Sequence, residues 1–282
     1  MSNKLINCKE LAQSIKDNVE EEFSKLNYKP ILVIFTDLTD DASAVYIKQK
    51  TKACDYCNIF SLVCDLAKYK NIEEVLDDIK IFNDSSIVAG IMVQLPQTTW
   101  DTDTLINAID PKKDVDGLTR YNVAQLHLHK PIEEYLAPCT PSGVIKVLES
   151  IDFDFEGARV LMVGRSDIVG RPLAELLLQR DCTVTIAHSK TREQDLRNDY
   201  DLIISAVGKP KFFYSFANSD GVLPVLIDVG INRDEDGKLC GDFNLDLSAY
   251  SYATPVPGGI GPMTVAMLMD NILKAWKLQN RD

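Results

Sequence analysis

The sequence predicts an α/β protein of two domains, the second of which is a Rossmann-like, doubly wound domain. Short continuous apolar runs, typical of strands buried on both faces, alternate along the chain with segments of helical periodicity. Parallel strands require helical crossovers, so this regular alternation indicates parallel sheets covered by helices. The length of 282 residues suffices for two domains, and the proline-rich segment 137–141 separates two series of strands and helices.

The first series begins with a helix and continues with strands separated by further helices. Asn7, followed by Glu10, forms a capping-box pattern ahead of an amphipathic segment. Ser43 is a candidate N-cap for a second helix, which we expect to end near Asn58. The other expected elements are strands over 31–35, 59–64 and 87–95 and helices over 72–82 and 101–109.

The second series repeats this order after the proline-rich segment. Ser142 is a candidate N-cap for a helix that ends near Ser150. A later helix is expected to begin near Gly170, with Pro172 in its first turn, where proline is tolerated. The other expected elements are strands over 159–163, 182–187, 202–206 and 225–229 and a final amphipathic helix over 263–277.

The composition argues against several classes of partner. The 42 acidic and 30 basic residues give a formal net charge of −12, without the lysine or arginine block that binds nucleic-acid phosphates. No apolar run approaches the roughly 20 residues of a membrane span, and the first residues lack the apolar core of a secretion signal. We therefore expect a cytoplasmic protein that binds neither nucleic acid nor membrane.

The seven cysteines are expected to be free thiols, because their number is odd and no secretion signal is seen. Cys54 and Cys57 form a C-x-x-C pattern, which also occurs in zinc and redox sites. A zinc site would need further ligands, and the chain has only three histidines. Buried packing cysteines are the favoured interpretation, so no metal is expected.

The stretch GRSDIVGRP, which begins at Gly164, follows an apolar run and resembles the turn between a dinucleotide-binding strand and its helix. Gly164 allows the tight bend and Gly170 allows the helix to pack closely on the strand. Ser166 stands where the middle glycine is usual, and its hydroxyl can bond a diphosphate at the helix N-terminus. A turn without any ligand would look similar, so this motif alone is a weak signal.

The end of the following strand indicates which nicotinamide cofactor binds. NAD-binding folds commonly place a carboxylate there to bond the ribose 2′-hydroxyl. Here the strand is followed by His188, Ser189 and Lys190, and none of them is acidic. Ser189, with Lys190 or Arg165 as a basic neighbour, would accept a 2′-phosphate, which favours NADP. His188 is interpreted as a capping or core residue.

Polar residues of the first domain occur where open α/β sheets bind ligands, at the carboxyl ends of strands. Tyr46 and Lys50 are four residues apart on one helix face, and burial beside an aromatic ring would let the lysine exchange protons near neutrality. Gln94 ends an apolar strand, and Asp114 and Asp116 lie in the turn PKKDVDG. Taken singly, these are a solvated lysine, a surface amide and local turn aspartates; together they would form a site for a heterocycle.

In this order the motifs resemble the bifunctional methylenetetrahydrofolate dehydrogenase/methenyltetrahydrofolate cyclohydrolase family. The resemblance runs nearly from end to end, through blocks that include ASAVYIKQK, GIMVQLP, PKKDVDG, PCTPSGV, VGRSDIVGRP and TPVPGGIGPMTVAMLM. It implies a folate-binding catalytic domain over 1–138, an NADP-binding domain over 139–261, and a C-terminal helix over 262–282 that packs back on the first domain. The implied partners are tetrahydrofolate one-carbon derivatives and, in a homodimer, a second copy of the chain.

The resemblance also implies roles for single residues of the first domain. Tyr46 matches the ring that stacks on the pterin, and Lys50 matches the acid–base group that Gln94 positions. Asp116 matches the carboxylate that holds the amidine edge of the pterin. The implied catalytic residues are therefore Tyr46, Lys50, Gln94 and Asp116, and the implied substrate-binding residues also include Leu95, Pro257, Gly258 and Gly259.

For the cofactor, Gly164, Arg165 and Ser166 match the phosphate turn, Ser189 the 2′-phosphate contact, and Ile231 the residue beside the nicotinamide half. The implied activity is NADP-dependent oxidation of 5,10-methylenetetrahydrofolate, followed by hydrolysis of the methenyl product to 10-formyltetrahydrofolate. This reaction belongs to one-carbon metabolism, which supplies purine, methionine and histidine biosynthesis.

The sequence departs from the family pattern in loops beside the expected folate pocket. The glycine usual near DLTDDAS is absent, and residues 97–99 replace the usual Leu-Pro after GIMVQLP. No matched site residue is lost, so both activities are expected. The alternatives are another two-domain NADP-dependent dehydrogenase of the shikimate type, or a non-catalytic dinucleotide-sensing module.

Overall fold

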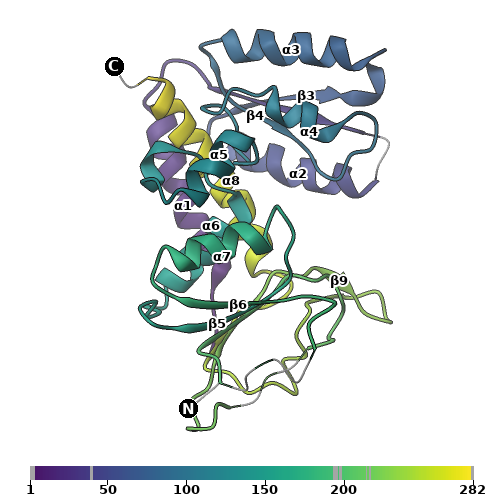
Figure 1. Cartoon of the computed structure of the whole chain (residues 1–282). Coiled ribbons are helices and arrows are strands. Elements are labelled where there is room, and N and C mark those ends of the chain that lie inside the picture. Colours follow the sequence, from purple (N-terminus) through teal and green to yellow (C-terminus); the bar gives the residue numbers. More distant parts are fainter. Residues whose placement is uncertain are drawn as a thin grey trace. The chain divides into compact units, whose positions relative to one another are not determined.

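The computed structural model describes residues 4–38, 41–192, 196, 199–213, 215 and 217–280, without the side chains of residues 41–46. The chain forms two compact units, drawn in Figure 1. The three-stranded unit contains Gln13–Cys139 and Val265–Asp282, and the six-stranded unit contains Thr140–Thr264 and the residues up to Ala12. The expected linker, 137–141, therefore contains a point of division.

The three-stranded unit is built on a parallel sheet in the order β3-β2-β4. These strands are β2 (Ile31–Thr36), β3 (Phe60–Asp65) and β4 (Val88–Val93). Ile34 of the central strand pairs with Val63 on one side and Met92 on the other. The helices that belong to this unit wholly or in part are α1 (Cys8–Ser24), α2 (Asp41–Tyr56), α3 (Ile72–Asp84), α4 (Thr102–Asn107), α5 (Arg120–His127) and α8 (Ile260–Gln279).

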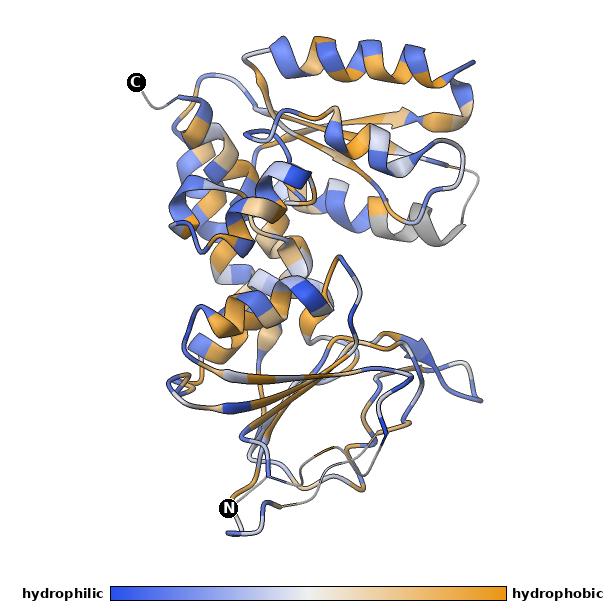
Figure 2. Cartoon of the chain, viewed as in Figure 1, coloured by the Kyte–Doolittle hydropathy of each residue, from blue (hydrophilic) through white to orange (hydrophobic). Residues whose placement is uncertain are grey.

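The alternation of side chains along β2 divides this unit into two hydrophobic cores. Leu32 and Ile34 belong to the cluster that also contains residues of α1, α2 and α8, whereas Val33 and Phe35 pack with residues of α3 and α4. Figure 2 shows the mixed hydrophobic and hydrophilic colouring of α3, as expected of a helix with one buried face. A strand buried on both faces needs apolar residues at every position, which explains the continuous run in the sequence.

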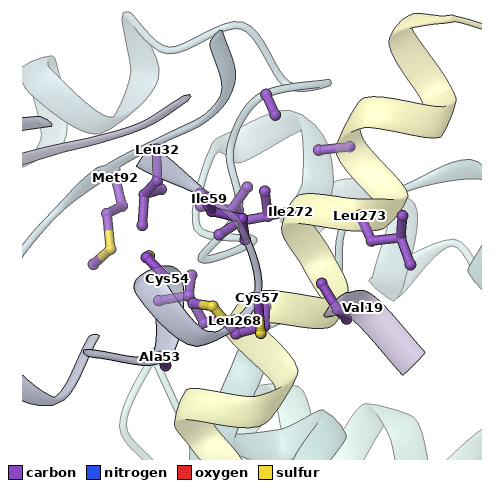
Figure 3. Close-up of a cluster of buried hydrophobic side chains, with 14 of the residues drawn as sticks. Val19, Leu32, Ala53, Cys54, Cys57, Ile59, Met92, Leu268, Ile272 and Leu273 are labelled. Atoms are coloured by element: carbon purple, nitrogen blue, oxygen red, sulfur yellow. The ribbon is translucent and has the colours of Figure 1, made fainter. Parts of the chain in front are cut away.

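Cys54 and Cys57 are buried free thiols in the first of these cores, as Figure 3 shows. Burial raises the pKa of each thiol to about 12. Both cysteines therefore stay protonated at neutral pH and pack as small hydrophobic residues. Among the residues that the structure describes, no group of three or more His, Cys, Asp or Glu side chains could hold a metal ion.

The six-stranded unit contains a parallel sheet in the order β1-β11-β8-β7-β5-β6. One face of this sheet packs against Tyr200, Phe243 and Tyr250 from connecting segments. The parallel order confirms the predicted α/β class, although within the described residues α7 is the one helix between β5 and β11. The elements assigned to this unit, besides parts of α1 and α8, are β1 (Lys4–Leu5), α6 (Cys139–Glu149), β5 (Arg159–Val163), α7 (Gly170–Leu178), β6 (Thr183–Ala187), β7 (Leu202–Ser205), β8 (Val225–Asp228), β9 (Asn232–Arg233), β10 (Leu239–Cys240) and β11 (Tyr252–Ala253).

Local capping explains several helix ends. Asn7 accepts a hydrogen bond from the backbone of Glu10 and donates one to its carboxylate, which confirms the predicted capping box. The predicted caps Ser43 and Ser142 are wrong, because α2 begins at Asp41 and α6 at Cys139, so that both serines lie inside the first turns.

Several short elements have no clear signal in the sequence. Helix α5 has no counterpart among the elements expected from the sequence, and its cap is Thr119, whose side chain accepts from the Asn122 backbone. Strand β1 joins the six-stranded sheet by pairing with β11, although the predicted first domain included it. Within the described part of the chain, no helix is long and apolar enough to cross a membrane.

Candidate functional site

The polar residues of the three-stranded unit gather at the point where the strand order reverses. The chain passes from β2 to β3 on one side, and then places β4 on the other side of β2. Ligands of open α/β sheets bind at the carboxyl ends of strands flanking such a point. Gln94 follows β4 directly, and its backbone donates to the carbonyl of Phe35 at 2.8 Å. The Gln94 side chain is therefore fixed at the edge where a ligand is expected.

Lys50 and Gln94 are in direct contact, although 44 positions separate them in the sequence. The Lys50 ammonium donates to Gln94 Oε1 at 2.9 Å and lies 3.6 Å from the Met92 sulfur. The Gln94 amide nitrogen donates to the carbonyl of Leu95 at 2.6 Å. Gln94 is only 6% exposed and Lys50 is half-buried. The amide thus has a fixed orientation, and its oxygen holds the ammonium group in place.

Asp116 lies in a turn that the chain packs tightly. The next residue, Gly117, has a φ of +68°, and a Cβ there would lie 2.6 Å from the carbonyl oxygen of Leu136. The Cys139 thiol donates to the carbonyl of Val115 at 3.3 Å and lies 3.8 Å from Asp116 Oδ1. The half-buried Asp116 carboxylate is therefore beside the first residue of α6.

The Cys139 thiol is affected by the charges of both Asp116 and Lys50. Burial raises the pKa of this thiol well above its usual range. The Asp116 carboxylate raises it further, and the Lys50 ammonium lowers it. Both charges therefore act on one thiol, and the structure brings Lys50, Gln94 and Asp116 into one neighbourhood of the three-stranded unit.

Asp114, in the same motif as Asp116, has a different environment. Its Oδ2 accepts hydrogen bonds from the Thr119 backbone at 2.7 Å and from the Asn122 amide at 2.8 Å. The side chain is buried, and this burial raises its pKa. Asp114 thus holds the turn in shape, as a local turn aspartate does, whereas Asp116 remains partly accessible.

Two predicted substrate contacts of this unit are placed with less detail. Tyr46 is in helix α2, but its side chain lies outside the described residues. Leu95 is half-buried and follows Gln94 at the strand end.

The hydroxyl of Thr36, at the end of β2, is fully buried without a hydrogen-bond partner in the described structure. Thr36 carries no distinctive signal in the sequence, because threonine is common in strands.

The predicted dinucleotide turn lies at the corresponding reversal point of the six-stranded sheet, between β5 and β7. Gly164 has a φ of +126°, and a Cβ there would lie 2.8 Å from the carbonyl oxygen of Ala206, just after β7. A Cβ on Gly170 would lie 2.5 Å from the carbonyl oxygen of Gly164. These are the close approaches that the first and last glycines of a dinucleotide turn permit, so the chain here fits a pyrophosphate.

Ser166 takes part in starting helix α7. Its hydroxyl accepts from the Gly170 backbone at 3.4 Å, and Arg165 and Ser166 are both exposed. The turn after β6 lies next to this segment, because the Gly164 backbone donates to the carbonyl of Ala187 at 2.9 Å. Exposed Ser189 follows in that turn. A phosphate at this edge would meet hydroxyl and basic groups.

His188 is a capping residue, as the sequence analysis expects. Its Nδ1 accepts from the Lys190 backbone at 3.1 Å, and its own backbone donates to the Thr191 hydroxyl at 2.9 Å. These bonds fix the turn that presents Ser189. They also occupy the imidazole nitrogen that a general base would need.

Ile231 is 49% exposed on a loop that two buried aspartates support. Asp228 accepts from the Gly230 backbone at 3.0 Å, and Asp242 accepts from the Asn232 amide at 2.9 Å. Asp242 also accepts from the Val207 backbone after β7. Neither aspartate was predicted from the sequence, where the signal for Asp228 is an acidic residue at the end of the apolar run of β8.

Residues 257–259 form the turn before α8, in the six-stranded unit. Pro257 is exposed and Gly259 is buried. Gly258 has a φ of +103°, and a Cβ there would lie 2.8 Å from Cε of Lys9. Lys9 was not singled out in the sequence, because it lies in an ordinary helix far from these residues along the chain.

Taken together, the two units define a class of protein: a two-domain α/β enzyme with a polar site on one sheet and a dinucleotide turn on the other. The comparisons with known proteins give the particular family. Residues 6–116 match the model described as tetrahydrofolate dehydrogenase/cyclohydrolase, catalytic domain. Residues 138–280 match its NAD(P)-binding domain. The chain belongs to the tetrahydrofolate dehydrogenase/cyclohydrolase family.

Individual relatives cover nearly the whole chain. The bifunctional protein FolD of Agathobacter rectalis is 44% identical in an alignment of 280 residues that covers 97% of this chain and 99% of that protein. The crystal structure of the bifunctional methylenetetrahydrofolate dehydrogenase/cyclohydrolase from Campylobacter jejuni is 38% identical, with a TM-score of 0.89 over 98% of this chain and 99% of that chain. A Trypanosoma brucei dehydrogenase-cyclohydrolase, complexed with NADP cofactor and inhibitor, is 31% identical, with a TM-score of 0.88 and full coverage of both chains.

These comparisons confirm the family predicted from the sequence blocks. They decide against the shikimate-type dehydrogenase and the non-catalytic sensing module, because both family domains match in the same chain. They do not assign single residues, so the roles of Lys50, Gln94 and Asp116 rest on the geometry described above.

Proposed function

We propose that this chain oxidises 5,10-methylenetetrahydrofolate with NADP and hydrolyses the methenyl product to 10-formyltetrahydrofolate, using Lys50, Gln94 and Asp116. The observation that carries the proposal is the 2.9 Å contact between the Lys50 ammonium and Gln94 Oε1 at the reversal point of the sheet. The relatives named bifunctional FolD support both activities.

NADP, when bound, accepts a hydride from the methylene carbon of the folate. This oxidation needs orientation more than proton transfer, since the two folate nitrogens stabilise the resulting cation. In the hydrolysis, water adds to the methenyl carbon, the bond from that carbon to ring nitrogen N5 breaks, and one proton is released. Lys50 transfers the proton between the water and the departing nitrogen, and Gln94 fixes its position.

The remaining contacts orient the folate. Asp116 accepts hydrogen bonds from the amidine edge of the pterin, a bidentate interaction that selects this heterocycle. Tyr46 stacks on the ring, and Leu95 borders it. Pro257, Gly258 and Gly259 contribute a backbone turn to the same substrate.

The cofactor is NADP, bound by the six-stranded unit. The turn at Gly164, Arg165 and Ser166 receives the pyrophosphate, Ser189 the 2′-phosphate, and Ile231 lies beside the nicotinamide half. The support for this assignment is the close packing of Gly164 and Gly170 and the absence of a carboxylate from residues 188–190. A family relative in complex with NADP agrees with it.

One assay tests the proposal directly. After methylenetetrahydrofolate and NADP are mixed with the protein, NADPH absorbance and methenyltetrahydrofolate absorbance are followed together. We expect NADPH to accumulate while the methenyl signal rises and then falls as it is hydrolysed. The dehydrogenase assignment is contradicted if no NADPH forms, and the cyclohydrolase assignment is contradicted if methenyltetrahydrofolate decays only at its uncatalysed rate.

The proposal extends to assembly and cellular role. The chain acts as a cytoplasmic homodimer, without nucleic acid or membrane partners, and supplies one-carbon units for purine, methionine and histidine biosynthesis. The domains are 1–138 with the helix 262–282 for folate, and 139–261 for NADP. Strand β6 is the last strand of the six-stranded sheet, and its Ile186 is 41% exposed, which suits a surface that pairs with a second copy.

A further inference from the structure

Asn271, on helix α8, makes two hydrogen bonds that the proposed function does not use. Its side chain is 4% exposed, and its amide nitrogen donates to the carbonyl of Val115 at 2.8 Å and to the carbonyl of Ala137 at 2.8 Å. The same nitrogen lies 3.5 Å from the Cys139 sulfur. Both donors of the amide are therefore engaged, and the two carbonyls belong to segments that are distant in sequence.

Both carbonyls belong to residues that are close in sequence to groups of the candidate site. Val115 directly precedes Asp116, and Ala137 precedes Cys139 by two residues. Between them the chain is packed without spare room, because a Cβ on Gly117 would lie 2.6 Å from the carbonyl carbon of Ala137. Asn271 thus joins the turn that carries Asp116 to the segment that leads into α6.

We infer that Asn271 is a positioning residue for folate binding, which acts by fixing the Asp116 carboxylate. This inference rests on the proposed function, in which Asp116 binds the pterin. A carboxylate that accepts two hydrogen bonds from one heterocycle must keep its position closely, and a shift of about 1 Å can weaken such an interaction a hundredfold. Without Asn271, the buried carbonyl of Ala137 would lose its amide donor, and that of Val115 would keep the Cys139 thiol, a weak donor. The Asp116 turn would therefore move to find stronger donors.

The first test is the variant Asn271→Ala in the full chain. We expect the KM for methylenetetrahydrofolate to rise about tenfold or more, whereas the KM for NADP changes less than twofold. A purely structural role would lower the maximal rate through the fraction of folded protein and leave both KM values unchanged, because KM does not depend on the amount of active enzyme. Equal changes in the two KM values would overturn the inference.

The second test asks whether Asn271 acts through Asp116. The folate KM is measured for Asp116→Ala, Asn271→Ala and the double variant. If Asn271 works by positioning the carboxylate, removing Asn271 has less than a twofold further effect once the carboxylate is gone. An equal effect in both backgrounds would show that Asn271 acts independently, which overturns the inference.

Gln279, on the same helix, provides a matched control. Its amide nitrogen also donates to backbone carbonyls, those of Ala89 at 2.9 Å, Ala275 at 3.0 Å and, more weakly, Lys112 at 3.5 Å, but none of these residues adjoins Asp116 in the sequence. Gln279→Ala should lower stability while changing the folate KM less than twofold. A rise in folate KM equal to that of Asn271→Ala would overturn the inference.

The variant Asn271→Ser provides a milder test in case Asn271→Ala does not fold, because serine keeps one hydrogen-bond donor. We expect its folate KM to lie between those of the wild type and Asn271→Ala, with circular dichroism as the check on folding. If the serine variant folds and binds folate like the wild type, the inference is wrong.

The proposed function and the role of Asn271 fail in different ways. A wild-type protein that never converts folate contradicts the proposed function. An active wild type in which the effects of Asp116→Ala and Asn271→Ala on the folate KM are additive contradicts only the role of Asn271.

Discussion

At the scale of single residues, Lys50 and Gln94 show how a helix and a strand end together fix an ammonium group at the proposed site. Lys50 is half-buried, and its ammonium has a fixed acceptor in the Gln94 amide. Orientation of this kind removes the entropic cost of arranging a flexible lysine at each turnover. The neighbouring Lys48 lies two positions earlier on α2 and is exposed, without this constraint.

Lys50→Met should abolish cyclohydrolase turnover and leave folate binding within about threefold of the wild type. Methionine keeps the length of the side chain but cannot carry a proton, and general acid–base groups contribute about 10²- to 10⁴-fold to rates. The measurement is the decay of methenyltetrahydrofolate absorbance, with Lys48→Met as the control. An unimpaired Lys50→Met enzyme would remove this residue from the mechanism.

Ser189→Asp should change the choice of cofactor. A carboxylate at this position would repel the 2′-phosphate of NADP and can bond the ribose 2′-hydroxyl of NAD. We expect kcat/KM for NADP to fall at least tenfold while that for NAD stays level or rises. Initial rates with the two cofactors provide the measurement, and an unchanged ratio would refute the role of Ser189.

Asp228 should make stability depend on pH. Burial raises the pKa of this carboxyl from 3.8 to about 6, so the folded protein holds its proton more tightly than the unfolded chain does. The contribution of Asp228 to the free energy of unfolding is therefore greatest below pH 4, falls as the pH rises to 6, and is level beyond. The decrease amounts to about 3 kcal/mol if the group titrates alone.

Urea unfolding between pH 4 and 7 measures this effect as the difference between the wild type and Asp228→Asn. The variant should be less stable overall, since Asp228 accepts backbone bonds from Gly230, Asp242 and Phe243, but it should lack this part of the pH dependence. Asp236→Asn, at an exposed position, is the control. Parallel pH curves for the wild type and Asp228→Asn would contradict the assignment.

At the scale of elements, the strands and the capping box could be predicted because they depend on local patterns. A strand buried on both faces is a continuous apolar run, and the Asn7–Glu10 pair satisfies helix donors within three residues. The predicted N-caps of α2 at Ser43 and of α6 at Ser142 were wrong. Serine also occurs inside the first turn of a helix, and the residue at which a helix begins depends on the preceding loop.

The junction of β5 and α7 yields a prediction at this scale. In Gly170→Ala the new methyl group would meet only backbone atoms, at 2.5 to 2.8 Å, so the turn at Gly164 would be forced outward. We expect the KM for NADP to rise about tenfold and the free energy of unfolding to fall by about 1–3 kcal/mol. Initial rates and urea unfolding provide the measurements.

Gly157→Ala is the matched control for this substitution. Its φ of +74° disfavours alanine, but a Cβ there would meet no atom within 4 Å. The control should lose stability without changing the KM for NADP. If Gly170→Ala binds NADP as the wild type does, the turn is not the pyrophosphate site.

At the scale of the whole molecule, the chain is two compact units with separate parallel sheets. Each sheet has its own reversal point, and each reversal point carries one of the two predicted sites. The residues proposed for folate chemistry (Lys50, Gln94 and Asp116) and those proposed for the cofactor thus belong to different units, and residues 257–259 are the proposed folate contacts in the six-stranded unit. A substitution in one core should therefore leave binding at the other largely intact.

The assembly of the chain is also testable at this scale. Sedimentation velocity at micromolar concentration should show a species of twice the 31.5 kDa chain mass. Ile186→Asp, on the edge strand β6, should shift this species toward the monomer, because a buried unpaired charge at an interface costs several kcal/mol. A wild-type protein that sediments as a monomer would contradict the homodimer.

The sequence by itself determined the family, the α/β class, the parallel sheets and the residues that carry the proposed chemistry, because these depend on local patterns and on long matching blocks. Only the tertiary structure decided which groups meet: the contact of Lys50 with Gln94, the different environments of Asp114 and Asp116, and the bonds from Asn271. The physical reason is that these contacts join residues up to 156 positions apart. No local pattern encodes such a pairing, because it forms only when α2, α8 and the strand ends pack around a shared core.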